Sequence, residues 1–333
     1  MMALRNRRAV AMLAALWLVV GISVVALEFS LVGRERRAFG LGAVDRAHGS
    51  AAALGAFAMT QAKLEAALRT GPQSTAGNLG RLRSSDPWLD VDSLYSGTIQ
   101  VDSMTVSVKA VDLGTMLNIN TLSETELKTL FMNLIGDFVK SDALAQSIVD
   151  WRDPDDIPRV QGGERDDYIK AGLLRLPSNQ QFRDIEELLD VKGMTPEIYA
   201  LVSPYLTTLG AAQVNLNSAP VPVLRVLTGM TDEILSRILS LRSRGSRIAS
   251  VAEVMPPAPR AGLSQQVQTA VAAQNQRAQQ QLSARAGVNT TQVQLTLLVR
   301  PSAAARAVRL RTVLQRSNVN GSPASQVLSE EWR

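Results

Sequence analysis

The 333-residue chain contains no cysteine, a single histidine and few aromatic residues, which make up 4% of the sequence. Without cysteine it cannot form a disulfide, a thiol nucleophile or a cysteine-ligated metal centre. The histidine, His48, has no nucleophile or carboxylate at a spacing that would pair with it. Neither a Walker loop nor a dinucleotide-binding fingerprint is present. We therefore expect a protein that is not an enzyme.

Charge is concentrated on both sides of one apolar segment near the N-terminus. Arg5, Arg7 and Arg8 precede an uncharged stretch over 9–27, and a basic cluster follows at 34–37. Nineteen residues of helix rise about 28 Å, close to the thickness of the bilayer core. We predict a membrane span over 10–33, with the N-terminus in the cytoplasm because the arginines precede it. The formal charge of +5 is therefore weak support for nucleic-acid binding.

A long helix is expected to continue after the span. No proline occurs over 34–69. Leu54, Phe57, Leu64 and Leu68 follow one another at spacings of three, seven and four residues, which is typical of the apolar stripe of an amphipathic helix. The Gly-, Ser- and Pro-rich segment that follows, 71–90, ends this helix.

Alternating sequences predict strands in two distant parts of the chain. Apolar and polar residues alternate over 104–110, after a polar pair at 102–103 that suggests a hairpin with 99–101. The same alternation returns over 293–299 and 308–314. Because two strands alone are marginally stable, we expect the early and late strands to form one antiparallel sheet. The intervening block would then be an inserted helical domain.

That block contains two weak internal echoes. Asn120 and Thr121 match Asn217 and Ser218 at an offset of 97 residues. The run Leu188 to Thr195, with Gly193, matches Leu224 to Thr231, with Gly229. Such helix, glycine turn, helix units resemble helix-hairpin-helix modules, whose turn can bind a nucleic-acid phosphate. The glycine can equally well end a helix in the left-handed conformation, and the acidic surroundings of Gly193 favour this structural role.

The richest polar region lies between the two echoes. Seven carboxylates and three arginines occur within the eighteen residues 150–167, on a segment that contains Gly162 and Gly163. Crowded carboxylates are costly unless a cation compensates them, and hard oxygen ligands on a flexible loop suit Ca²⁺. A solvated acidic loop explains the same composition, so the residues alone leave both interpretations open.

Several motifs in a shared order make a family resemblance specific. They follow the basic, apolar N-terminus and are 118–122 (NINTL), 148–153 (IVDWRD), the Gly-Gly acidic motif that ends at Tyr168, 188–195 (LLDVKGMT) and 214–220 (VNLNSAP). In these motifs the chain resembles the minor pseudopilin K family of the type II secretion system.

The resemblance implies an α+β fold, in which a pilin-like long N-terminal helix packs on an antiparallel sheet. A large all-α insertion domain of helix-hairpin-helix or SAM-like repeats interrupts the sheet. The implied division is a prepilin leader at 1–9, the membrane half of the helix at 10–33, a pilin-like body at 34–116, the inserted domain at 117–262, a polar Gln-rich linker or helix at 263–288, and the closing strands and tail at 289–333.

The resemblance also implies processing and location. A prepilin peptidase would cut between Ala9 and Val10, where most relatives have glycine instead of alanine, and the new N-terminus would be methylated. The mature protein would then be a single-pass protein of the bacterial inner membrane, with its body in the periplasm.

Relatives bind calcium in the inserted domain, so the resemblance favours Ca²⁺ as the cofactor. Transferred by motif, the candidate ligands are Asp150, Asp153, Asp155, Asp156, Glu164, Asp166 and Asp167. Glu164 and Arg165 stand where the family has alanine and glutamate, and an arginine at a ligand position would repel the ion. We therefore expect one site to be lost or rearranged around Glu164.

The expected function is that of a minor pseudopilin that caps or nucleates the tip of the periplasmic pseudopilus during protein export. Its expected partners are the minor pseudopilins I and J and the prepilin peptidase. The alternative is a membrane-anchored helix-hairpin-helix protein that binds DNA in uptake or competence. We do not expect nucleic acid as a partner, because the turn at Gly193 is acidic.

Overall fold

The computed structural model describes residues 42–69, 86, 88, 91–210, 213–257, 264–303, 305–319 and 322–333, with single residues at 23, 27, 28 and 30. Ala9, Val10 and nearly all of the predicted span 10–33 lie outside these residues. Within the described part of the chain, no helix is both long enough and apolar enough to cross a membrane.

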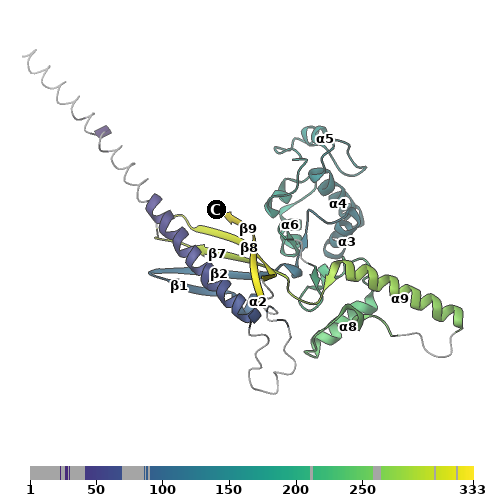
Figure 1. Ribbon diagram of the computed structural model, residues 1–333. Coiled ribbons are helices and arrows are strands. Elements are labelled where there is room, and N and C mark those ends of the chain that lie inside the picture. The colour runs from purple at the N-terminus through teal and green to yellow at the C-terminus, as the bar shows by residue number, and fades with distance from the viewer. Residues whose placement is uncertain are drawn as a thin grey trace, which may run out of the picture.

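A five-stranded antiparallel sheet forms one half of the molecule (Figure 1). Its order is β1 (Gly97–Val101), β2 (Met104–Asp112), β7 (Gln292–Val299), β8 (Val308–Val319) and β9 (Ser322–Trp332). The hairpin over 97–112 and the pairing of β2 with β7, from Val106 opposite Val299 to Asp112 opposite Val293, confirm that early and late strands share one sheet.

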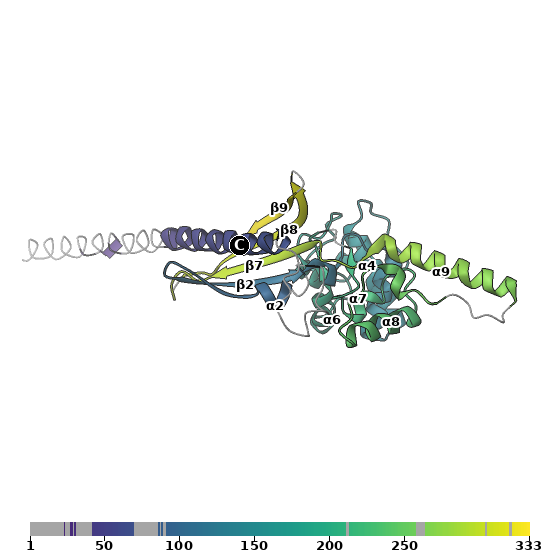
Figure 2. The same ribbon diagram turned by 60° about the horizontal axis from the view of Figure 1, so that its bottom comes forward.

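Residues 42–69 are helical and pack on one face of this sheet through small side chains (Figures 1 and 2). Ala52, Ala53 and Ala56 are buried in the same cluster as the inward-facing residues of β2, β7 and β8. A Cβ atom at Gly49 would lie 2.7 Å from Cγ of Pro301, so the helix comes too close to the sheet for any larger residue there.

The prediction of an apolar stripe on this helix is wrong at one residue, Leu54. Leu64 and Leu68 are buried and Phe57 is partly buried, but the side chain of Leu54 is 45% exposed. The large residues alone misplace the contact face, because glycine and alanine make the closest approach to the sheet.

The chain between β2 and β7 forms a helical domain with its own core. Its helices are α3 (Glu124–Ile135), α4 (Phe138–Arg152), α5 (Arg165–Lys170), α6 (Pro196–Val202), α7 (Val221–Leu224), α8 (Asp232–Ser243) and α9 (Gln265–Arg285), while α2 (Val91–Tyr95) belongs with the sheet. Of the two alternatives for 263–288, the structure has the helix, and Leu282 of α9 is buried in the core of the helical domain.

Two short parallel strand pairs divide this domain into two units. β3 (Leu117–Asn118) pairs with β4 (Leu206–Thr207), and β5 (Val214–Asn215) pairs with β6 (Ala286–Gly287). In each unit the first strand pairs with the last strand. The two units therefore have the same closed arrangement.

The sequence echo at an offset of 97 residues corresponds to the same hydrogen bonds in both units. The side chain of Asn120 donates to the carbonyl of Phe182 at 2.9 Å and accepts from its N–H at 2.8 Å. Asn217 makes the same two contacts with Ile248, both at 2.9 Å.

An arginine closes each unit in the same way. Arg152, at the end of α4, donates to the carbonyls of Ile119 and Leu122. Arg242, near the end of α8, donates to the carbonyls of Leu216 and Ala219. Both sets of acceptors lie in the motif that follows the first strand of the unit, and they also differ by 97 residues.

A buried carboxylate joins the sheet to the helical domain. Asp112, the last residue of β2, accepts hydrogen bonds from the side chains of Asn215 (3.0 Å), Ser218 (2.9 Å) and Thr290 (3.0 Å). Burial raises the pKa of Asp112, although these hydrogen bonds and one from the N–H of Gly114 oppose the increase. The carboxylate thus ties the last residue of β2 to the start of the second unit and to the segment before β7.

Candidate cation site

The acidic loop lies between α4 and α5, where the first unit has a long connection. In the second unit the chain passes from Arg242 to Ile248 within a few residues, whereas in the first unit the acidic residues and α5 lie between Arg152 and Phe182. The acidic segment is therefore an addition to the repeated arrangement.

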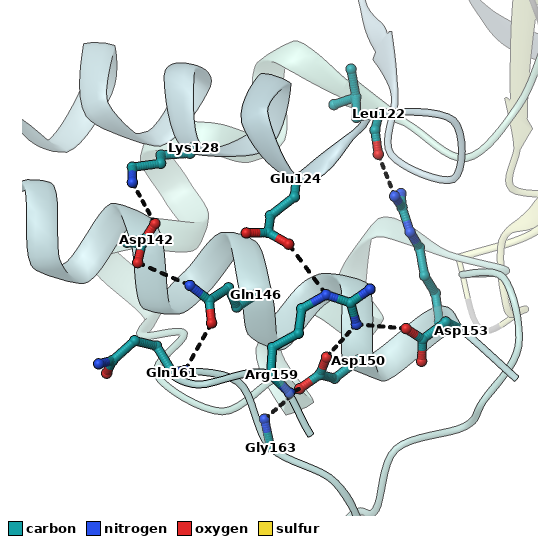
Figure 3. A network of polar contacts seen from close by, with 11 residues as sticks. Leu122, Glu124, Lys128, Asp142, Gln146, Asp150, Asp153, Arg159, Gln161 and Gly163 are labelled. Atoms are coloured by element: carbon teal, nitrogen blue, oxygen red, sulfur yellow. Dashed lines mark hydrogen bonds and ion pairs between the residues drawn. The ribbon is translucent and has the colours of Figure 1, made fainter. Parts of the chain in front are cut away.

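Asp150 anchors the loop from the last turn of α4 (Figure 3). Its side chain is completely buried and accepts from the N–H of Arg159 at 3.0 Å and from the N–H of Gly163 at 2.8 Å. A Cβ atom at Gly162 would lie 2.0 Å from Oδ2 of Asp150, which explains the glycine in the Gly-Gly motif. Asp150 thus shapes the loop instead of offering free oxygens to an ion.

Arg159 is the cation inside the acidic cluster (Figure 3). Its guanidinium lies 2.6 Å from Asp150, 2.6 Å from Asp153 and 3.2 Å from Glu124. Burial alone would lower the pKa of Arg159, but the hydrogen bonds to Asp150 and Asp153 and the attraction of both carboxylates raise it. The sequence prediction missed this residue and attended to Arg165, which is exposed on α5.

Glu164 is the least satisfied carboxylate of the cluster. Its side chain is buried, and neither of its oxygens has a hydrogen-bond partner. Burial, followed by the charges of Asp150, Asp153, Asp156 and Asp155, raises the pKa of Glu164 to about 7. A buried carboxylate without a donor is unfavourable when ionised, so this environment suits either a proton or a bound cation.

Three of the seven predicted ligands come together. One oxygen each of Asp153, Asp155 and Glu164 lies within 4.8 Å of the other two. Oδ1 of Asp153 and both oxygens of Glu164 are buried without a partner, whereas Oδ1 of Asp155 accepts from the N–H of Ile157 at 3.0 Å. Asp155 is exposed, so the group is open on one side. Three carboxylate oxygens in this arrangement fit a hard cation such as Ca²⁺, which takes oxygen ligands in flexible geometry.

The other predicted ligands have different partners. Asp156 accepts from the side chain of Asn179 at 2.8 Å, and Asp167 accepts from the N–H of Glu164 at 3.2 Å and so caps α5. Asp166 is exposed on α5 and lies outside the group of three. Within the described residues the structure therefore brings together Asp153, Asp155 and Glu164, with Arg159 at one edge.

An aromatic cluster in the core of the helical domain lies next to the acidic loop. The ring of Trp151 lies 5.9 Å from that of Tyr168 and 6.2 Å from that of Phe182, between ring centroids. The hydroxyl of Tyr168, which is fully buried, accepts from the N–H of Lys192 at 2.8 Å. These contacts tie α5, through Tyr168, and the end of α4, through Trp151, to the core of the helical domain.

The fold defines a class of protein: a helix packed on an antiparallel sheet that is interrupted by a two-unit helical domain. Residues 109–211 match the family model described as type II secretion system (T2SS), protein K. This match confirms the resemblance found in the sequence for residues 109–211.

Curated relatives agree with the family match. The chain is 31% identical over 122 residues to the provisionally named type II secretion system protein K of Escherichia coli strain K12, which covers 34% of this chain and 37% of that protein. It is 26% identical over 135 residues to type II secretion system protein K of Pectobacterium carotovorum subsp. carotovorum, covering 35% and 41%. The chain thus matches less than half the length of these relatives.

One solved structure extends the comparison to most of the chain. The crystal structure of the GspK–GspI–GspJ complex from the type 2 secretion system of enterotoxigenic Escherichia coli aligns with a TM-score of 0.54 and 17% identity. The alignment covers 90% of this chain and 98% of the chain it matches. At this identity the likeness shows a shared fold of mixed helices and antiparallel sheet.

Proposed function

We propose that this protein is a minor pseudopilin of a type II secretion system and that it caps or nucleates the tip of the pseudopilus. The family match over 109–211 and the shared fold support this role. The protein would act by assembly and not by catalysis.

The observation that carries the proposal is the outward face of the helix over 42–69. Leu54 and Met59 are 45% and 46% exposed, and their spacing of five residues places them on opposite flanks of the face turned away from the sheet. The exposed alanines at 47, 51, 58, 62 and 66 lie on the face between these two flanks. An outward helix face made of two large apolar residues and alanines is typical of a surface that another helix covers.

The proposed partners for this face are the minor pseudopilins I and J. The neighbour with the shared fold is described as a complex with its own GspI and GspJ. Helices of such partners would bury Leu54 and Met59 while the opposite face of the helix stays on the sheet.

The position of the helical domain supports a role at the tip. In Figures 1 and 2 the domain lies next to the C-terminal end of the helix over 42–69 and extends to the side of the sheet. A domain of this size beside the end of the packing helix would block a further subunit above it. We propose this steric stop as the reason for a terminal position.

Processing and anchoring belong to the same proposal. The leader 1–9 would be removed between Ala9 and Val10 by a prepilin peptidase, with methylation of the new N-terminus. Residues 10–33 would hold the protein in the bacterial inner membrane, with its body in the periplasm. The arginines at 5, 7 and 8 support this orientation, since positive residues remain on the cytoplasmic side.

We further propose that Asp153, Asp155 and Glu164 hold Ca²⁺. A bound cation would compensate the charge of Asp155 and Glu164 and would add to that of Arg159, which already pairs with Asp153 at 2.6 Å. Asp153 directly follows α4 and Glu164 directly precedes α5. Joining them would therefore fix both ends of the acidic loop.

The test is co-purification of the full chain with its I and J counterparts from detergent-solubilised membranes. Leu54→Glu and Met59→Glu should abolish capture of both partners, because each places a charge in the proposed helix contact. Leu94→Glu is the matched control, since Leu94 of α2 is 62% exposed outside this face. Equal capture of I and J by all three variants would contradict the proposal that this helix face binds them.

The alternative function, DNA binding by the glycine turns, has little structural support. Gly229 has φ +88°, but its turn is covered by α9, since a Cβ atom there would lie 2.8 Å from the carbonyl oxygen of Ala278. The amine of Lys192, beside Gly193, donates to the carbonyl of Gly162 at 2.6 Å. The turn at Gly229 is covered by a helix, and the amine of Lys192 is already bound within the protein. Few donors at these turns are therefore available to bind a phosphate.

A further inference from the structure

Asp153 belongs both to the candidate cation site and to the ion pairs of Arg159 (Figure 3). Its Oδ2 lies 2.6 Å from a guanidinium nitrogen of Arg159, whereas its Oδ1 is buried without a hydrogen-bond partner. A cation in the site and the guanidinium would therefore bind the same carboxylate. Two positive charges that share one carboxylate repel each other, so each weakens the attraction of Asp153 for the other.

Arg159 does not fill the cation site itself. Among the residues that the structure describes, its guanidinium pairs with Glu124, Asp150 and Asp153, and Glu164 is not one of these partners. Glu164 is 4% exposed, and both of its oxygens are buried without a hydrogen-bond partner. Because a buried carboxylate without a donor is unfavourable when ionised, the site still favours a further positive charge beside Arg159.

The position of Arg159 is fixed by contacts outside the cation site. Its guanidinium lies 2.6 Å from Oδ1 of Asp150, and its backbone N–H donates to Oδ2 of the same residue at 3.0 Å. Asp150 is completely buried, so movement of the guanidinium would leave a buried charge without its counter-ion. An incoming cation must therefore bind next to a positive charge that stays in place.

Arg165, the arginine that the sequence indicates as repelling the ion, is less suited to this effect. It is exposed on α5, where water and salt screen its charge. The side chains of Arg159 and Asp153 are 34% and 17% exposed, so their charges are screened less. The structure therefore moves the expected repulsion from Arg165 to Arg159.

We propose that Arg159 is a built-in competing cation that sets the affinity of Asp153, Asp155 and Glu164 for Ca²⁺ at a dissociation constant of about 0.1 to 1 mM. The net charge of the ligands is one of the properties that tune such affinities. The inference rests on the proposed calcium site and adds its regulation. The site would fill at the Ca²⁺ levels of extracellular modules and stay empty at the lower levels that intracellular sensors detect. The acidic loop would thus be locked only after the helical domain has crossed the inner membrane.

The test is calorimetric titration of the full chain with Ca²⁺ in non-ionic detergent at pH 8, where Glu164 is ionised. Arg159→Gln removes the charge, whereas Arg159→Lys keeps the charge but loses the planar fork of the guanidinium. We expect Arg159→Gln to bind Ca²⁺ about tenfold more tightly than the native protein, because the repulsion across Asp153 is gone. Arg159→Lys should stay within about twofold of the native affinity, since the charge remains.

Both variants should lose stability in urea, because neither reproduces the paired contacts of Arg159 with Asp150 and Asp153. A purely structural role would instead weaken Ca²⁺ binding in both variants. Arg165→Gln is the matched control, since it removes the same charge from an exposed residue directly after Glu164, and it should change the affinity by less than about twofold. Arg159→Met is the second neutral variant if Arg159→Gln does not fold, because methionine adapts to irregular spaces.

Equal or weaker Ca²⁺ binding by Arg159→Gln would overturn the proposal. So would the same gain in affinity for Arg159→Gln and Arg159→Lys, or for Arg159→Gln and Arg165→Gln. If the native protein binds Ca²⁺ and Arg159→Gln binds it no better, the calcium site stands and only the role of Arg159 is refuted. If neither protein binds Ca²⁺, the calcium site is refuted together with this role, while capture of I and J, measured separately, still tests the proposed assembly.

Discussion

The guanidinium of Arg159 lies 2.6 Å from a carboxylate oxygen of Asp150, a residue whose side chain has no contact with solvent. The ion pair therefore compensates a buried charge that the N–H groups of Arg159 and Gly163 satisfy only in part. Removing one partner of a buried ion pair is costly because the other charge stays buried.

Arg159→Ala should accordingly destabilise the helical domain. We expect a loss of about 3 kcal/mol in the free energy of unfolding, the lower end of the range for such pairs, since Arg159 is itself one third exposed. Urea unfolding followed by tryptophan fluorescence, in a variant that keeps Trp151 and replaces the other three tryptophans by phenylalanine, measures this change. Arg165→Ala is the control and should cost less than about 0.5 kcal/mol, because Arg165 is exposed. A similar cost for both variants would mean that Arg159 is not the essential counter-ion.

Glu164 should make stability depend on pH when divalent cations are absent. Its pKa is raised in the folded protein, from an ordinary value of 4.5 to about 7. The folded state therefore holds the proton of Glu164 more tightly than the unfolded state does. The resulting contribution to the free energy of unfolding is fully present below about pH 4.5 and is lost as the pH rises towards 7.

The matched variant for this effect is Glu164→Gln, which keeps the shape and remains neutral. Relative to this variant, the native protein should lose about 3 kcal/mol of stability between pH 4.5 and 7, an order of magnitude set by the size of the pKa shift. Thermal unfolding in a chelator at several pH values measures the difference. If the stability of both proteins changes with pH in the same way, Glu164 is not buried as a neutral acid.

Calcium binding should depend on Asp155 and not on Asp166. Both residues are exposed, but only Asp155 belongs to the group of three oxygens within 4.8 Å of one another. Asp155→Asn should remove most of the calorimetric heat and of the thermal stabilisation by Ca²⁺, whereas Asp166→Asn should leave both unchanged. If native protein and both variants give no heat at pH 8, where Glu164 is ionised, the cation site is absent.

Much of the sheet could be predicted from sequence because its inward face is regular. The apolar residues of β2, β7 and β8 alternate with polar ones and pack under one helix, so local pattern and tertiary role agree. β9 was missed because no residue between Ser322 and Trp332 is buried. That strand is defined by its pairing with β8, which leaves no hydrophobic signal in its own sequence.

The candidate site was predictable in composition but not in geometry. The acidic loop and its Gly-Gly motif indicated where carboxylates gather, yet the motif could not tell which oxygens remain free. Asp150 is occupied by backbone N–H groups and Asp156 by Asn179, contacts that depend on the path of the loop. Arg159 carried no signal beyond being one arginine among many carboxylates, because its role arises only when the loop folds back over α4.

Arg242 should be essential to the second unit in the way that Arg152 is to the first. Its guanidinium donates to the carbonyl of Leu216 at 2.6 Å and to that of Ala219 at 2.7 Å, and burial lowers its pKa to about 10. Arg242 still carries its charge at pH 7. Arg242→Ala would leave these carbonyls unsatisfied, and we expect a loss of about 2 to 3 kcal/mol in unfolding free energy.

Arg244→Ala is the matched control, because Arg244 is an exposed arginine two residues further on, and its side chain donates to the hydroxyl of Ser240 at 2.6 Å. It should cost less than about 0.5 kcal/mol. Amide hydrogen exchange locates the effect: Arg242→Ala should weaken protection in α7, α8 and the pairing of β5 with β6, and leave α3 and α4 protected. Equal loss of protection in both units would mean that they unfold together and that each arginine does not stabilise its own unit.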